Sequence, residues 1–363
     1  DADEVDFNGN FDTTGNVTLS GITELTTVAA AGSIDAGGNV SIGTVANIDI
    51  DGTIEADGDV DLTTDDDIID VNGAITGASV DLFGDEIKLS STISANTGDI
   101  NLTGGGTTKI TLEGNSVASA ENGNITFDGK VNGASDLEAD AAGGTVNFND
   151  TIGDSTALTG LDVHADDLAL GGTVTVAGGI DVDSDTILLG DAAGTITTTA
   201  AGGAVDLGGA AVDAATADTP ALNITSAGEI VVGPIGQNTR VAGITLAVDT
   251  NTDRITLGGS ADSAGAITVD AAATNIHLDD DVDLNANDAA ITLGNIADAN
   301  AHNLGAHAGT GDVQIGTIAN GADVDIDGAE IILGNTTAAS VDIDGTNITI
   351  NAITATDGIS AVA

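Results

Sequence analysis

The sequence has no cysteine, methionine, tryptophan or tyrosine, and it contains only five phenylalanines and two prolines among its 363 residues. Without cysteine the chain has no thiol nucleophile, no thiolate metal ligand and no disulfide framework. With so few aromatic rings, a core has to be built from aliphatic side chains, which makes a conventional sandwich or barrel core unusual. The apolar runs are far shorter than the roughly 20 residues that a spanning helix needs, so we expect no membrane insertion.

Basic residues are also scarce, since 58 acidic residues face only five lysines and arginines, for a formal net charge of −53. A field of this sign repels nucleic acid and anionic lipid surfaces and attracts cations. DNA and RNA are therefore excluded as partners, whereas divalent cations are expected ones. An acidic surface with few lysines also suits a saline habitat, and the two explanations are compatible.

What the sequence does contain is one short motif that recurs from end to end: a turn residue followed by an apolar–polar–apolar triplet. Clear copies at a spacing of about 20 residues begin at Gly15, Gly38, Gly58, Gly98 and Gly123. Companion triplets lie between them, so each period holds about three short strands separated by glycine, asparagine or aspartate turns. A period of this length is typical of solenoids. The sequence predicts an all-β fold, a parallel β-helix (β-solenoid) with about 20 residues and three short strands per coil.

Alternation within each strand places every second side chain inside, where Val, Ile and Leu stack on their equivalents in neighbouring coils. Asp, Asn and Thr then face water. Two further series repeat in steps of 21 residues, as equivalent positions in stacked coils would: Lys88, Lys109 and Lys130, and the pair Phe127 and Phe148. These series support the register.

We find no linker that requires a domain boundary and expect a single continuous solenoid over residues 1–363. Two segments depart from the repeat. Residues 1–14, with Phe7 and Phe11, are expected to form a strand that is either exchanged with a neighbouring copy or caps its own first coil. Residues 295–311 lack the alternation and are expected to form a loop excursion.

Aspartate clusters are the main candidates for a binding site. On a strand, the D-x-D spacing places two carboxylates on one face about 7 Å apart, and the next coil can bring others within about 5 Å. Hard cations, chiefly Ca²⁺, would relieve the repulsion through oxygen ligands. The alternative is a solvated outer face that binds no metal. The candidate ligands are Asp49, Asp51, Asp65, Asp66, Asp67, Asp279, Asp280, Asp281, Asp323, Asp325, Asp327, Asp342 and Asp344.

Residues suited to catalysis are sparse. The histidines are scattered, and only two arginines could pair with an anionic sugar. No tryptophan or tyrosine is available to stack on a sugar ring. We therefore expect no enzyme activity, and a polysaccharide-active enzyme stays a minor alternative. The residues in question are His164, His277, His302, His307, Arg240 and Arg254.

Eight N-x-S/T sequons occur, and several lie on the outward side of the repeated motif, where they could carry N-linked glycan in a glycosylating host. Chance is the competing explanation, because asparagine and threonine are both abundant. The sequons begin at Asn16, Asn39, Asn101, Asn124, Asn149, Asn223, Asn335 and Asn347.

The motif G-[DN]-[VI]-x-[LI], with intervening [IV]-x-A and G-[TA]-I segments, covers nearly the whole chain. It resembles the filamentous-haemagglutinin-like and surface-layer-associated β-strand-repeat proteins of prokaryotes. That resemblance implies a right-handed parallel β-helix, exported to the cell surface, that serves adhesion, a sheath or a matrix. The Asn-Pro secretion signatures usual in those exported proteins are not found here.

Together these features predict an extracellular structural protein, a subunit of a filament, sheath or surface layer that polymerises with copies of itself. Assembly would proceed through the solenoid ends or by strand donation, and Ca²⁺ would strengthen it. The alternative is an adhesin stalk or surface-binding module, for which residues 295–311 are the candidate binding site.

Overall fold

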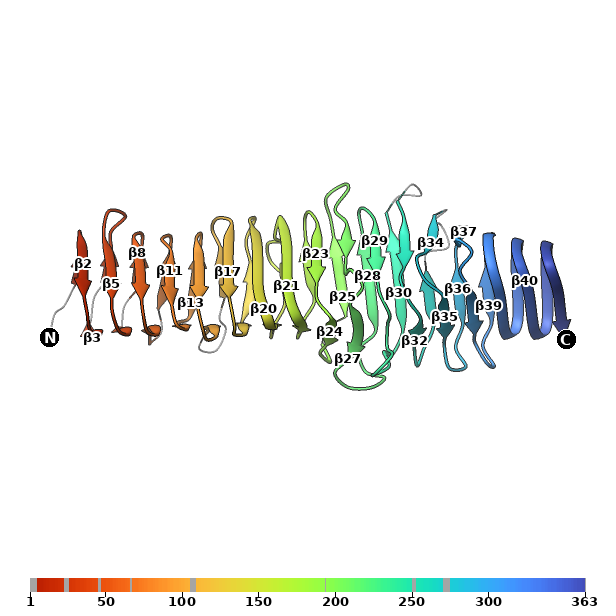
Figure 1. Cartoon of the computed structure of the whole chain (residues 1–363), viewed down its shortest axis with the longest axis horizontal. Helices are drawn as coiled ribbons and strands as arrows, with labels where there is room; N and C mark the ends of the chain where they lie inside the picture. The colour runs from red at the N-terminus through yellow and green to blue at the C-terminus, as the bar shows by residue number, and fades with distance from the viewer. Residues whose placement is uncertain are drawn as a thin grey trace. The chain divides into compact units, whose positions relative to one another are not determined.

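The computed structural model describes residues 5–22, 26–44, 47–65, 67–104, 109–192, 194–249, 253–269 and 275–362. Within these ranges the regular structure consists of β-strands, and no helix occurs. The chain divides into two compact units, residues 1–176 and residues 177–363. In each unit successive coils stack through parallel strand pairs (Figure 1). The parallel β-solenoid predicted from the repeat is confirmed, and its arrangement is consistent with the right-handed coil.

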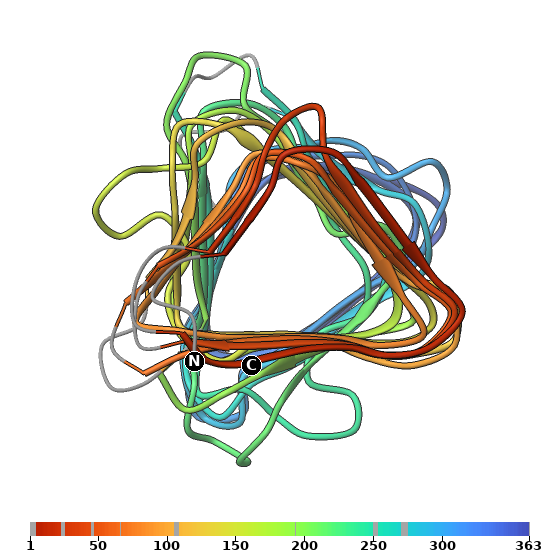
Figure 2. The same cartoon turned by 90° about the vertical axis from the view of Figure 1, so that its left-hand side faces the viewer.

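The coils of the first unit have three sides, seen end-on in Figure 2 as a triangle of red, orange and yellow traces. We call the sides faces A, B and C. Face A consists of β1 (Val5–Phe7), β4 (Thr26–Val28), β7 (Ile48–Ile50), β10 (Ile68–Val71), β13 (Glu86–Leu89), β16 (Lys109–Leu112) and β19 (Lys130–Asn132), and β22 (Val174–Val176) extends its row through Ile152. Face B consists of β2 (Asn10–Thr13), β5 (Ser33–Ala36), β8 (Thr53–Ala56), β11 (Ile75–Gly77), β14 (Thr92–Ala95) and β17 (Ser116–Ala120). Face C consists of β3 (Val17–Ile22), β6 (Val40–Thr44), β9 (Val60–Thr64), β12 (Val80–Phe83), β15 (Ile100–Thr103) and β18 (Ile125–Asp128), and β20 (Asp136–Phe148) and β21 (Gly160–Leu170) run through faces B and C.

The second unit has faces D, E and F. Face D consists of β23 (Ile180–Asp183), β26 (Val205–Asp206), β29 (Ile230–Val232), β31 (Ile255–Leu257), β34 (Ile276–Leu278) and β37 (Ile296–Asp298). Face E consists of β24 (Thr186–Leu189), β27 (Ala211–Ala214), β32 (Ala261–Asp262), β35 (Val282–Asn285) and β38 (Leu304–His307). Face F consists of β25 (Thr195–Thr198), β28 (Leu222–Ser226), β30 (Ile244–Val248), β33 (Ile267–Val269), β36 (Ile291–Leu293) and β39 (Val313–Ile315). The long β40 (Ile318–Val362) continues all three faces.

The core consists of aliphatic rows that run from coil to coil. On face A, Ile48, Ile69, Ile87 and Ile110 are direct register partners, and all four side chains are fully buried. Burying an aliphatic side chain of this size contributes about 1.5 to 3 kcal/mol, so a row repeated on three faces is the main stabilising term. The residues between the core positions point outward and carry the charge.

The corner before face C explains why glycine followed by asparagine or aspartate recurs at the start of the motif. The Oδ1 atom of Asn16 accepts the backbone N–H of Asn39 at 3.0 Å, and Oδ1 of Asn39 accepts the N–H of Asp59 at 3.2 Å. A Cβ on Gly58 would lie 2.0 Å from Oδ1 of Asn39, so only glycine fits above that oxygen. We call this series of side-chain-to-backbone bonds the corner ladder. It accounts for the G-N pair at Gly38 and the G-D pair at Gly58, where an added Cβ would lie 2.2 and 2.0 Å from the ladder oxygens.

Two segments need separate comment. Residues 295–311 do not form the loop excursion that we expected: β38 lies within them and pairs with β35 on one side and β40 on the other. Buried and outward side chains do alternate here, and Leu304, Ala306 and Ala308 are all buried. The pattern is weak in the sequence because two of these inward residues are alanines. At the other end, β1 and β2 pair with β4 and β5 of the same chain, so the described part of residues 1–14 forms a first coil.

Candidate functional site

On the outer side of face A, three of the unit's acidic side chains come together. Asp49 and Asp70 are direct partners in the parallel register of β7 and β10. Asp51 follows Asp49 by two residues, and its Oδ1 accepts a hydrogen bond from Nδ2 of Asn72 at 3.2 Å. We call Asp49, Asp51 and Asp70 the acidic ladder. The expectation that adjacent coils juxtapose carboxylates is met here by the register itself.

The acidic ladder is electrostatically strained. Partial burial raises the pKa of Asp49, and the charges of Asp51 and Asp70 raise it further. Burial also raises the pKa of Asp70, with the charge of Glu113 as the next cause. Among the residues that the structure describes, Oδ1 of Asp49 and Oδ1 of Asp70 are buried without a hydrogen-bond partner. A proton or a cation would stabilise both oxygens.

The next predicted cluster, Asp65 to Asp67, shapes a corner. Asp66 lies outside the described residues. The backbone carbonyl of Asp67 accepts the hydroxyl of Thr64 at 3.0 Å and the N–H of Asp85 at 3.0 Å. Both hydrogen bonds are to the backbone carbonyl of Asp67, so they do not require the Asp67 carboxylate.

In the second unit a shallow groove of about 300 Å³ runs across β32, β35, β38 and β40 on face E. We call it the acidic groove. Three of the predicted ligands line it, and a carboxylate and a histidine outside the predicted set accompany them. Its polar lining consists of Ser260, Asp281, Asp283, Asn303, His307, Asp323 and Asp325.

Part of this lining belongs to a second corner ladder. Oδ1 of Asp281 accepts the N–H of Asn303 at 2.8 Å, and Oδ2 accepts Nδ2 of Asn303 at 3.1 Å. Oδ1 of Asn303 in turn accepts the N–H of Asp323 at 3.1 Å, and Oδ1 of Asp323 accepts the hydroxyl of Ser340 at 2.6 Å. Asp281 and Asp323 thus hold successive coils in register.

The histidines of residues 295–311 also contact the preceding coil. Nε2 of His307 lies 3.3 Å from Oδ1 of Asp283, and Nδ1 of His302 lies 3.7 Å from Oδ1 of Asp281. His307 stands directly between Asn285 and Asp327 in the strand register. Both histidines lie in the segment expected to form a loop, and the signal that places them is their separation in sequence from Asp281 and Asp283, which is close to one coil.

The remaining candidates are spread along the same unit. Asp327 and Asp344 line a neighbouring shallow groove of about 370 Å³ with three glycines. Asp279, Asp280 and Asp342 are exposed, and Oδ1 of Asp280 accepts the N–H of Asp281 at 2.8 Å. Over the described ranges, no three acidic or histidine side chains converge into a group that could hold a metal ion. Calcium binding therefore stays a prediction.

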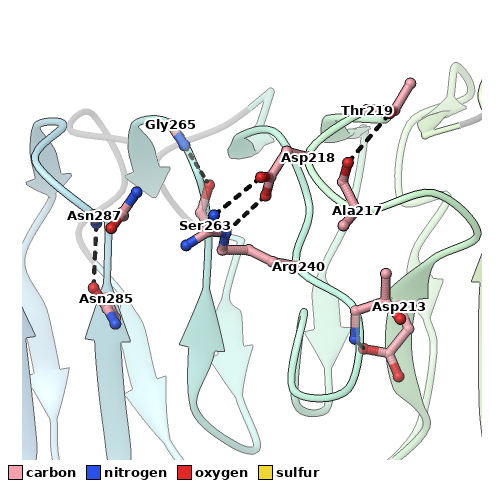
Figure 3. A network of polar contacts seen from close by, with 10 residues as sticks. Asp213, Ala217, Asp218, Thr219, Arg240, Ser263, Gly265, Asn285 and Asn287 are labelled. Carbon is pink, nitrogen blue, oxygen red and sulfur yellow. Dashed lines mark hydrogen bonds and ion pairs between the residues drawn. The ribbon is translucent and has the colours of Figure 1, made fainter.

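The sequence contains no sign of a polar network at one corner of the second unit, drawn in Figure 3. Arg240 forms a two-pronged ion pair with Asp218, with Nε to Oδ1 at 2.7 Å and the second N–H group to Oδ2 at 3.0 Å. This hydrogen bonding lowers the pKa of Asp218. The buried Asp213 accepts the N–H groups of Asn238 and Thr239 at 3.0 and 3.1 Å.

Four of the five basic side chains also join neighbouring coils. Each of the following lies against a carboxylate one coil away: Lys88 with Glu113, Lys130 with Asp154, Arg240 with Asp218 and Arg254 with Glu229. The two arginines that could have bound an anionic sugar are therefore already paired. Their partners could be found only once the coil length was known.

No protein-family model, curated protein sequence or solved structure matches the chain. The class that the fold defines is the parallel β-solenoid. The resemblance to filamentous-haemagglutinin-like and surface-layer-associated proteins rests on the repeated motif alone. In the ranges that the structure describes, no helix is long and apolar enough to span a membrane.

Proposed function

We propose that the chain is an extracellular structural protein, a subunit of a filament, sheath or surface layer that assembles by end-to-end stacking of solenoid coils. The observation that carries the proposal is the stacking itself: β40 pairs in parallel with β37, β38 and β39, so its backbone edge and core rows match those of any further coil. Val341 and Ile343 are buried, at 2 % and 0 % exposure, whereas Ile359 in the last turn is 56 % exposed. Ile348 and Ile350 between them are half-exposed.

An uncovered parallel coil can bind another coil of the same cross-section. Its strand edge offers backbone N–H and C=O groups, and its half-exposed aliphatic side chains would continue the core rows. In the first unit, β1 has a partner only on the side of β4 among the described strands. Stacking of one copy's coils on those of another would pair such edges, and a head-to-tail contact of this kind gives an open filament.

The charge distribution also favours ends over sides. Each copy carries a net charge of −53, most of it on outward positions, so lateral contact between copies is repulsive. The aliphatic rows of the core, which a stacked copy would continue, carry no such charge. Divalent cations would screen the sides and, at the acidic ladder and acidic groove, would relieve specific carboxylates.

The test is electron microscopy of the purified protein, with sedimentation as a second readout. Ile350→Lys places a charge in a half-exposed apolar row of β40, and Thr349→Lys places the same charge on the exposed side of the same turn. We expect filaments from the unsubstituted protein and from T349K, and none from I350K. Circular dichroism checks that each variant folds. Dispersed short particles under all salt and calcium conditions would contradict the proposal.

A surface-binding module is the second candidate, because the acidic groove is a localised feature on residues 281–325. Such a site would bind a cationic partner. Asp283→Asn and Asp325→Asn should abolish that binding and leave filament formation unchanged, which separates the two functions.

A further inference from the structure

The structure divides the eight sequons by the role of the asparagine side-chain nitrogen Nδ2, the atom to which N-linked sugar is attached. At Asn16 and Asn39 the side chain belongs to the corner ladder through its oxygen, which accepts a backbone N–H of the next coil. A backbone N–H can only face the oxygen, so the orientation of each amide is fixed. Both side chains are exposed, and in the residues described Nδ2 has no partner.

The hydroxyl that completes each of these sequons is also placed outward. Thr18 is exposed and Ser41 is half-buried, and each lies two residues after its asparagine, at the start of a face C strand. The residues between them, Val17 and Val40, are buried in the core. The extended backbone thus presents amide and hydroxyl together to an approaching enzyme.

Four other sequons are engaged by the protein. Nδ2 of the half-buried Asn101 donates to Oδ1 of Asp81 at 2.7 Å, a short bond to a charged acceptor. Nδ2 of Asn124 donates to Asp99 at 3.3 Å, and Nδ2 of Asn149 to Asp128 at 3.4 Å. Nδ2 of Asn223, also half-buried, donates to the carbonyl of Ala221 at 3.4 Å.

The last two sequons, at Asn335 and Asn347 on β40, resemble the free pair. Both asparagines are exposed, as are Thr337 and Thr349 two residues later. Neither amide nitrogen donates a hydrogen bond to another described residue.

From these contacts we propose that the protein is N-glycosylated at Asn16, Asn39, Asn335 and Asn347, and that the engaged sequons, represented by Asn101, are not used. In the transfer, a bond forms between Nδ2 and C1 of an oligosaccharide, and the bond from C1 to the phosphate of a polyprenyl-phosphate carrier breaks. The amide gives up one proton to a base of the transferase, and the lipid phosphate leaves. Oδ1 keeps its corner-ladder bond throughout, so the glycan projects outward without disturbing the coil.

The inference rests on the export required by the proposed function and is independent of assembly. Filament formation by unglycosylated protein from a host without the transferase tests assembly alone. The glycan is tested by mass spectrometry of glycopeptides from protein purified from the cells that make it.

The discriminating variants are Asn16→Asp and Asn39→Asp. Aspartate occupies the equivalent corner position at Asp99, whose Oδ1 accepts the backbone N–H of Asn124 at 2.7 Å, so it preserves the corner-ladder acceptor while removing Nδ2. We expect each variant to lose the mass of one glycan, and Ser41→Ala to lose the glycan of Asn39. Asn101→Asp should leave the mass of attached sugar unchanged. Unmodified Asn16 and Asn39 in the native protein, or sugar at Asn101 as abundant as at Asn39, would overturn the proposal.

Discussion

The rings of Phe127 and Phe148 lie stacked in the core of the first unit, with centroids 4.7 Å apart and planes inclined by 6°. They are register partners on face C, in the row that holds Leu102 one coil earlier. In the same two coils, face B carries only alanines, Ala118 and Ala139, at the position that Ile93 fills one coil before. The larger side chains on one face thus accompany smaller ones on another, as close packing at constant cross-section requires.

This compensation predicts the cost of core substitutions. Phe127→Ala should lower the free energy of unfolding by about 3 to 5 kcal/mol, because it leaves a cavity that the stacked coils cannot close. Phe83→Ala is the matched control: its ring is 41 % exposed, and we expect a change within about 0.5 kcal/mol. Urea denaturation measures both.

A paired substitution tests whether the volumes are coupled. Phe127→Leu together with Ala118→Ile recreates the Leu102 and Ile93 combination of the preceding coil. The double variant should lose less stability than the sum of the single variants, with a coupling of roughly 0.5 kcal/mol or more. Strictly additive losses would show that the two faces pack independently.

The corner ladder makes Gly58 sensitive to a single methyl group. Gly58→Ala places a Cβ 2.0 Å from Oδ1 of Asn39 and should destabilise the protein by about 1 to 3 kcal/mol. Gly43→Ala is the control, since its Cβ meets no atom within 4 Å and its backbone is compatible with alanine. A thermal melt that fails to separate the two variants would argue against the corner ladder.

The acidic ladder predicts a pH dependence of unusual sign. Because the folded-state pKa of Asp49 is raised above 3.8, the folded protein binds more protons than the unfolded chain just above that pH. The stability that protonated Asp49 contributes is therefore complete below pH 3.8 and is lost as the pH rises through the folded-state pKa. Asp49→Asn should raise the melting temperature at pH 7 and flatten the gain on acidification, which thermal melts over that pH range measure.

Calcium binding is tested by melting in millimolar Ca²⁺ and in chelator at equal ionic strength. A site that binds only the folded protein adds about 2.7 kcal/mol when Ca²⁺ is at 100 times its dissociation constant. We expect the gain to shrink in Asp283→Asn/Asp325→Asn, whose carboxylates line the acidic groove. An equal gain from matched Na⁺ would show that the acidity is an adaptation to salt.

Much of the fold could be predicted because its determinants are local. The apolar–polar–apolar triplet specifies which residues face inward, and the pairing of Phe127 with Phe148 follows from a constant step. The lysine series was only partly right. Lys109 and Lys130 are partners, but Lys88 pairs with Thr111, because that coil is two residues longer than the series assumes.

Coil length is what the sequence does not reveal. Partner residues are 18 positions apart from Ile69 to Ile87 and 28 apart from Ile196 to Ile224. The surplus residues are accommodated at corners, where core alternation gives no signal. The contacts of the candidate site residues could not be predicted for the same reason, because the partner of a carboxylate depends on how many residues each coil contains. Thus the separation of Asp283 and His307 could be recognised as one coil only after the length of that coil was known.

The corner ladder also makes the coils interchangeable. The oxygens of Asn16 and Asn39 each accept a backbone N–H, a group that the next coil presents whatever its side chains. Removing residues 39–58 would offer the N–H of Asp59 to Asn16 and set Val60 beside Val17 without altering the cross-section. The solenoid can therefore be lengthened or shortened in steps of about 4.8 Å by duplicating or deleting whole coils.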